Sequence, residues 1–248
     1  QRLTGQASIS YTNTFGKHFV ELLALGELND YKSNAHSAYA KLLPFAELPE
    51  LNFGQPTDGP ISGWSSAWRS AGYVFRARYN WDERYLAEFT GRYDGSYKFA
   101  GMRKTRWGFF PSASLGWRVS EESFFEPLKK TIDNFKVRAS LGSLGNQVTN
   151  SNFDYIGLMG SKTLAYILGS NQATAITPAS LAYSNVTWEK VTTANFGLDF
   201  GLFNNRLNAS FDYFIRYTDD MVVSKAYPAV MGTSGGKENL ASMRTNGW

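Results

Sequence analysis

The stretch RYLAEFTGRYDGSYKFAGMRKTRWGFFPSASLGWRV, residues 84–119, decides the fold class of this chain. It holds two runs in which apolar and polar side chains alternate, and a polar segment with several glycines joins them. Most apolar side chains stand at odd-numbered positions, which we call the apolar parity. They are Tyr85, Ala87, Phe89, Gly91 and Tyr93 in the first run, and Phe109, Pro111, Ala113, Leu115, Trp117 and Val119 in the second. Successive side chains of a strand point to opposite faces, so this period of two predicts two strands with unlike faces.

The same alternation recurs along the chain and predicts about nine strands. Besides the two runs above, we expect strands at residues 2–12, 19–29, 72–80, 135–142, 192–202, 207–218 and 240–248. Tight turns are expected at 16–17, 81–83 and 204–205, and longer connections at 30–66, 96–106, 120–134, 143–186 and 224–239. The first long connection holds four of the prolines, which argues against a central strand there.

Composition narrows the class of protein. Aromatic residues make up 16% of the 248, while charged residues, at 19%, fall below the roughly 25% usual for soluble domains. Aromatic enrichment is typical of strands in general and of the interfacial girdles of membrane barrels. The chain has no run of 18 apolar residues, which argues against a helical membrane protein. The net charge of +4 is mild and the basic residues are scattered along the sequence, which argues against nucleic-acid binding. The chain has no cysteine, which rules out disulfides and thiolate metal sites.

Two architectures produce such alternation: a soluble β-sandwich and a barrel in a membrane. Sandwich strands cluster near 5–6 residues, whereas a tilted strand that spans a bilayer needs about 9–11, which is closer to the runs seen here. A one-residue shift in register would exchange the two faces of the strand at residues 73–80. It would place Arg76 and Arg78 in lipid, at a cost of roughly 4–8 kcal/mol. The clean parity therefore favours an all-β, antiparallel transmembrane β-barrel.

Several segments also resemble a known family, the SusC/RagA family of TonB-linked outer-membrane transporters of Bacteroidetes-type bacteria. The matching segments, which cover well over half of the chain in the family's order, are QRLTGQASISYTNTFGKH (1–18), RYDGSYKFAG (92–101), RWGFFPSASLGWRVSEESFF (106–125), FKVRASLGSLGNQ (135–147), TWEKVTTANFGLDFGLFNNRLNASFDYFIRYTDDMV (187–222) and NLASMRTNGW (239–248).

This resemblance implies a 22-stranded, multi-pass barrel in the outer membrane of a Gram-negative bacterium, plugged by an N-terminal domain. It further implies a SusD-like surface lipoprotein as a lid, and import of oligosaccharides or peptides powered through TonB. No plug domain, TonB box, signal peptide or finishing strand is recognised, so residues 1–248 are expected to be an internal to C-terminal part of one barrel domain. TonB would then act through the missing N-terminal part. A siderophore- or vitamin-type TonB-dependent receptor is one alternative, and a soluble β-sandwich carbohydrate-binding module is another.

Neither catalysis nor a cofactor is expected. No catalytic constellation or phosphate loop appears, and the two histidines, His18 and His36, are too far apart in sequence to suggest a metal site. The predicted lumen-lining residues are Arg76, Arg78, Glu88, Arg92, Arg118, Lys136, Arg138, Asp199, Asp212 and Arg216. We expect these charges to pair with one another or with the plug and to solvate the wall; direct contact with substrate is the less favoured alternative.

Aromatic residues in or beside the expected loops are the candidates for substrate contact, because binding residues concentrate on loops held by a rigid scaffold. They are Trp64, Trp68, Tyr155, Tyr166 and Tyr183. Loop packing and the outer aromatic girdle are the alternative roles for these rings.

Overall fold

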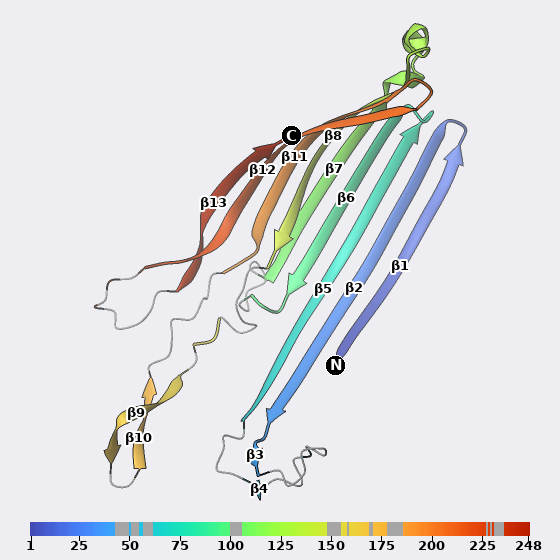
Figure 1. Ribbon diagram of the computed structural model, residues 1–248. Coiled ribbons are helices and arrows are strands. Elements are labelled where there is room, and N and C mark those ends of the chain that lie inside the picture. Colours follow the sequence, from blue (N-terminus) through green and yellow to red (C-terminus); the bar gives the residue numbers. More distant parts are fainter. Residues whose placement is uncertain are drawn as a thin grey trace.

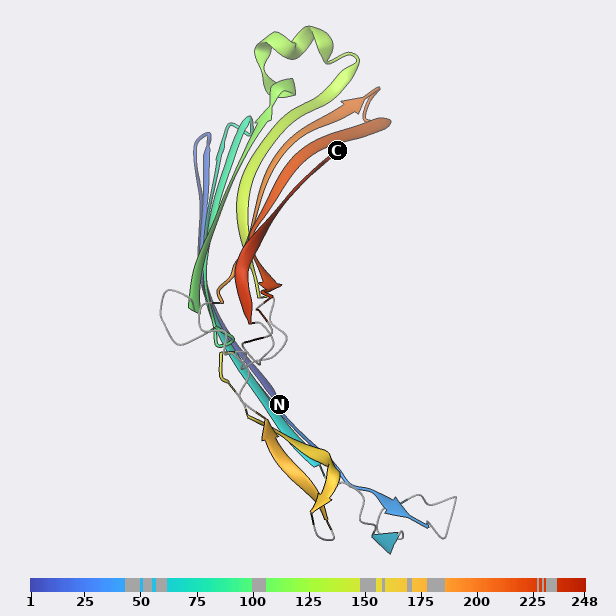
Figure 2. The same ribbon diagram turned by 90° about the vertical axis from the view of Figure 1, so that its left-hand side faces the viewer.

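The chain forms one large antiparallel sheet of nine strands (Figure 1). The computed structural model describes residues 1–42, 50, 55–56, 62–99, 106–147, 155–157, 159–168, 171–177, 186–226, 228, 230 and 236–248. In order across the sheet, the strands are β1 (Arg2–Phe15), β2 (His18–Ser37), β5 (Ser62–Trp81), β6 (Tyr85–Ser96), β7 (Trp107–Arg118), β8 (Ile132–Asn146), β11 (Glu189–Leu202), β12 (Leu207–Ser224) and β13 (Lys237–Gly247). Figure 2 shows that this sheet is curved, like a section of a wall.

Smaller elements lie at the two ends of the strands. The short pair β3 (Ala40–Lys41) and β4 (Gln55–Pro56) and the pair β9 (Gly160–Leu168) and β10 (Asn171–Thr177) lie at the end with the long connections (Figure 1). Two 3-10 helices, η2 (Val119–Glu121) and η3 (Ser123–Leu128), lie at the opposite end, where the tight turns are. No helix among the described residues is long and apolar enough to cross a membrane.

The predicted strands are confirmed, but several are longer than the periodicity indicated, β2 and β5 most of all. β2 and β5 pair without interruption from His18 opposite Trp81 to Ser37 opposite Ser62. Residues 30–37 and 62–66, expected to belong to a connection, are therefore strand, and so are residues 67–71, which precede the predicted strand at 72–80. Small side chains such as Ser, Ala and Gly carry much of this extension, so the backbone ladder forms without a strong apolar alternation. The predicted connection at 143–186 likewise contains the end of β8 and the β9–β10 pair.

The register assembles one continuous apolar face. A single row crosses six neighbouring strands through Tyr79, Ala87, Leu115, Ala139, Phe196 and Tyr213. The large side chains of this row are open to the surroundings: Leu115 is 64% exposed and Phe196 45%. In a sandwich this face would be covered, yet no second sheet packs against it in the part of the chain that the structure describes. The nine described main strands therefore form a single sheet and not the two packed sheets of a sandwich.

Two belts of stacked aromatic rings border the apolar face. Near the tight turns, Trp81 stacks on Tyr85 at a centroid distance of 5.3 Å, and Tyr85 on Trp117 at 6.4 Å. Eight residues further along the strands, Trp107 stacks on Tyr93 at 4.9 Å and on Tyr73 at 6.2 Å. Eight residues span roughly 26 Å of strand, or about 20 Å of height at a barrel's usual tilt. That height is close to the apolar band of an outer-membrane barrel, about 25 Å, with its two aromatic girdles.

Candidate functional site: the polar face and the β2–β5 projection

The opposite side of the sheet, called here the polar face, carries all ten predicted lumen-lining residues. The pairing of Arg78 with Glu88, of Arg118 with Lys136 and of Lys136 with Asp199 places these charges on one side of neighbouring strands. The remaining members follow by parity on the same strands. A hollow of about 350 Å³ opens on this face, bordered by Arg78, Glu88, Lys136, Arg138 and Asn195.

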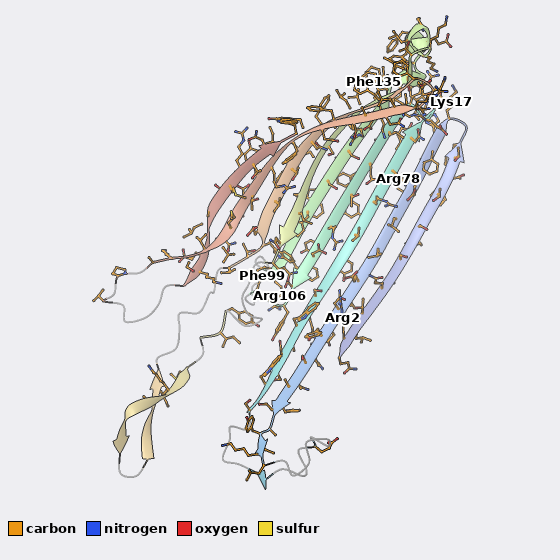
Figure 3. All side chains as sticks on the ribbon, viewed as in Figure 1. Arg2, Lys17, Arg78, Phe99, Arg106 and Phe135 are labelled. Atoms are coloured by element: carbon orange, nitrogen blue, oxygen red, sulfur yellow. The ribbon has the colours of Figure 1, made fainter. Side chains whose placement is uncertain are left out.

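One cluster of ion pairs on the polar face joins β2, β5 and β6. Glu21 accepts hydrogen bonds from Arg76 at 2.6 Å and from Arg78 at 3.0 Å. Arg78 also lies 3.3 Å from Glu88 on the next strand, so negative and positive charges alternate across three strands. Glu21 was missed from the sequence because Leu23 and Leu25 share its parity and hide the alternation of β2. Figure 3 marks the place of Arg78 on β5.

A second cluster joins β8, β11 and β12. Arg138 donates two hydrogen bonds to Asp199, at 2.7 and 3.0 Å, and a third to Asp212 at 3.1 Å. Asn195 donates to the other oxygen of Asp212 at 3.0 Å. The Arg138 side chain reaches Asp212 across β11 because Gly197 stands between them. A Cβ at Gly197 would lie 2.6 Å from Asp212 Oδ1 and 2.8 Å from Arg138 Cζ.

The other predicted polar-face residues divide into paired and unpaired charges. Arg92 binds Asp94 with two hydrogen bonds of 3.0 and 3.1 Å, and Arg118 lies 3.2 Å from Glu83. Lys136 and Arg216 have no acidic partner within the described residues, although the Arg216 guanidinium lies 5.6 Å from the ring of Phe214. Eight of the ten predicted residues thus have an oppositely charged partner among the described residues, which makes the polar face nearly self-neutral.

The polar face continues onto a two-stranded ribbon that extends beyond the neighbouring strands. This β2–β5 projection comprises residues 31–37 and 62–68, because β1 pairs with β2 only as far as Tyr31 and β6 pairs with β5 only from Ser70 onward. It is visible in Figure 1 as the two strands that continue alone toward β3 and β4.

Two predicted aromatic residues come together with a third on this projection. Trp68 stacks on Tyr31 of the facing strand, with centroids 5.8 Å apart and planes 24° from parallel. Trp64 lies on the same parity of β5, four residues and thus two pleat repeats further out, and is 61% exposed. Both tryptophans are strand residues, and Tyr31 was missed because residues 30–66 read as a connection. The three rings form an aromatic surface continuous with the polar face.

Of the remaining predicted aromatic residues, Tyr155 has a ring contact with another tyrosine. Tyr155 contacts Tyr97 edge to face at 6.4 Å, and burial together with a hydrogen bond to Tyr97 raises the pKa of Tyr155. Tyr166 lies within β9, and Tyr183 lies outside the described residues.

Metal ligands do not gather in the described part of the chain, where no group of three or more His, Asp or Glu side chains could hold an ion. His18 is bonded to the Tyr79 hydroxyl at 2.7 Å, and His36 lies far along the same strand.

An apolar outer face with two aromatic belts and an ion-paired inner face define the wall of an antiparallel membrane barrel. The family model "TonB dependent receptor-like, beta-barrel" matches residues 1–248, and the chain belongs to that family of outer-membrane receptors.

Curated relatives and solved structures agree with this assignment and confirm the predicted resemblance to SusC/RagA. The chain is 34% identical to TonB-dependent receptor SusC of Bacteroides thetaiotaomicron over 180 residues, 71% of this chain and 17% of SusC. It is 28% identical to TonB-dependent receptor P3 of Formosa agariphila over 97% of this chain and 24% of that relative. The chain thus spans a quarter or less of the length of these relatives.

Solved structures share the fold. The RagAB peptide importer in its closed-closed state superposes with a TM-score of 0.83 over 99% of this chain and 26% of that chain, at 22% identity. The siderophore receptor PirA from Acinetobacter baumannii superposes with a TM-score of 0.50 at 13% identity, over 99% of this chain and 31% of that chain.

Proposed function

We propose that this chain forms part of the wall of a SusC-like TonB-dependent transporter, which imports oligosaccharides or peptides across the outer membrane of a Gram-negative bacterium. Residues 1–248 belong to one barrel domain, and strands from the rest of the protein close the barrel. A plug domain inside the barrel faces the ion pairs of the polar face. TonB acts on the part of the protein that carries the plug.

The identity to SusC over most of this chain is the observation that carries the proposal. The two faces support it physically, because lipid requires an uncharged outer surface, whereas a lumen accepts paired charges. Because eight of the charged residues are paired, the polar face has little net charge. Such a face can contact water and a plug without strongly attracting ions of one sign. Family membership supports the role of transporter or receptor rather than enzyme.

Substrate contact is proposed for the aromatic surface of the β2–β5 projection. Flat rings at the mouth of a barrel suit both sugar faces and peptide side chains, and Trp64 and Trp68 carry such rings on the same parity of β5 as Arg76 and Arg78. A SusD-like surface lipoprotein would enclose the substrate from outside. Tyr155, Tyr166 and Tyr183 remain candidates for the same role or for contact with the lipoprotein.

Uptake by cells tests the proposal. A strain that lacks the gene should fail to take up one labelled substrate class from a panel of neutral oligosaccharides and short peptides, and the wild-type gene should restore uptake. Affinity purification of the tagged protein in detergent should recover a SusD-like lipoprotein. Unchanged uptake across the panel and purification without any such lipoprotein would contradict the proposal.

Trp68 offers a sharper test of the aromatic surface. Trp68→Ala should lower the uptake of that substrate about 2–10-fold, as expected for the loss of one ring contact worth 0.5–1.5 kcal/mol. Trp68→Phe should retain most of it, and Leu115→Ala on the apolar face is the control that should change nothing. Equal loss in the control would show that the effect comes from folding and not from binding.

A siderophore-type receptor is the second candidate, favoured only by the likeness in fold to PirA. Uptake of a labelled ferric siderophore by the wild-type strain, lost on gene deletion, would support this candidate instead.

A further inference from the structure

The segment VSEESFFEPLKK, residues 119–130, contains an amphipathic 3-10 helix at the tight-turn end of the sheet. A 3-10 helix repeats every three residues, so its side chains fall into three stripes. In η3 one stripe is polar, with Ser123 and Glu126. The other two are apolar: Phe124 with Pro127, and Phe125 with Leu128.

Specific contacts fasten this segment to the apolar face of the sheet. The carboxylate of Glu122 accepts hydrogen bonds from the Tyr85 hydroxyl at 2.7 Å and from Trp117 Nε1 at 3.1 Å, both members of the aromatic belt. Phe125 is only 5% exposed and stacks on Phe135, with centroids 6.0 Å apart. Phe135 in turn stacks on Phe200 of the apolar face at 4.7 Å. The position of Phe135, beside the 3-10 helices, is labelled in Figure 3.

Two apolar side chains of the fastened segment stay open to the surroundings. Phe124 places its edge against Trp117 at 6.5 Å and is still 65% exposed, and Leu128 is 52% exposed. The charges around them are mostly engaged within the protein. Glu121 lies 3.4 Å from Arg118 and 3.8 Å from Lys129, and Arg84 lies 3.7 Å from Glu122.

We propose that η3 is an interfacial membrane contact, in which Phe124 and Leu128 enter the leaflet of phospholipid at the tight-turn end of the barrel. The segment is fixed to the lipid-facing aromatic belt, and its exposed apolar side chains, Phe124 and Leu128, extend that belt outward. An amphipathic element at this depth lies in the plane of the interface, with its polar stripe toward water. This proposal rests on the sheet being a membrane wall, which the test below checks separately.

Fluorescence quenching in lipid nanodiscs tests the proposal on the full-length transporter. The chain contains no cysteine, so single cysteines can carry the fluorophore NBD once any cysteines elsewhere in the protein are replaced. The reporting variants are Phe124→Cys and Leu128→Cys, the control on the polar stripe is Ser123→Cys, and the control on the wall is Leu115→Cys. The quenchers are phosphatidylcholines with a nitroxide either near the headgroup or near the end of the acyl chain.

Quenching by the headgroup-proximal nitroxide should be about twofold or more stronger at Phe124 and Leu128 than at Ser123. Leu115 should be quenched by the deeper nitroxide. Quenching at Leu115 without any at Phe124 or Leu128 would overturn the interfacial contact while leaving the wall intact. Cross-linking of the same two positions to a second copy or to another protein would overturn it too. No quenching at Leu115 would overturn the membrane wall itself, and heat-dependent gel mobility would show that each variant is folded.

Discussion

At the scale of single residues, Gly197 is the position that the second ion-pair cluster requires. Gly197→Ala should destabilise the protein by about 1–3 kcal/mol, the usual cost of inserting a methyl group into filled space, because the new Cβ meets both Asp212 and Arg138. The thermal midpoint of the full-length protein in detergent measures this effect. Gly5→Ala is the control, since no atom of the described residues lies within 4 Å of its Cβ position. Equal thermal midpoints for Gly197→Ala and Gly5→Ala would contradict the contact that the Arg138 side chain makes with Asp212 across Gly197 of β11.

Glu21 is the residue on which the first cluster depends, since it binds two arginines and is 18% exposed. Glu21→Gln should cost about 1 kcal/mol, the upper end of the range for partly exposed pairs, because Arg76 loses its carboxylate. Glu88→Gln is the control and should cost less, since Arg78 keeps Glu21. Thermal midpoints in detergent compare the two variants. A larger loss for Glu88→Gln would show that the cluster is centred elsewhere.

At the scale of elements, the docking of the η2–η3 segment should depend on pH. Hydrogen bonds from Tyr85 and Trp117 hold the pKa of Glu122 below its ordinary value of 4.5. A carboxyl group with a lowered pKa stabilises the docked segment fully at pH values above its ordinary pKa. This stabilisation is lost as the pH falls through the lowered pKa. The segment should therefore be docked at neutral pH and loosen only below about pH 4.5.

A nitroxide attached at Ser123→Cys reports this loosening as increased mobility in the electron paramagnetic resonance spectrum. Glu122→Gln should abolish the transition, because an amide does not titrate in this range. A transition that persists unchanged in Glu122→Gln would assign it to another group.

The strands themselves show where sequence reasoning succeeds and where it stops. Residues 111–118 alternate strictly, and the observed strand β7 (Trp107–Arg118) matches the predicted strand at 109–119 closely. β2 and β5 reach much further than predicted, because their outer residues are held by pairing with each other and not by burial of alternate side chains. Glu21 lies opposite Arg78, and Tyr31 stacks on Trp68, because of the register between β2 and β5. The alternation within one strand does not reveal which residues of two strands face each other.

At the scale of the whole molecule, the described sheet has two open edges. β1 pairs only with β2 and β13 only with β12 among the described residues. Open edges with a wide apolar face favour association, so the 248-residue chain produced alone should aggregate in water and need detergent to stay dispersed. Light scattering with and without detergent measures this behaviour. A monodisperse monomer in plain buffer would contradict the membrane face.

The central claim is that one parity of each strand faces lipid and the other faces the lumen. Nitroxide labels placed one at a time at residues 86–93 of the full-length protein in lipid bilayers, with their oxygen accessibility measured by power saturation, test it most directly. Odd positions on β6, such as Ala87 and Phe89, should show high oxygen accessibility, and even positions, such as Glu88 and Arg92, should show low values. High values at the even positions, or no period of two across the eight labels, would contradict the account.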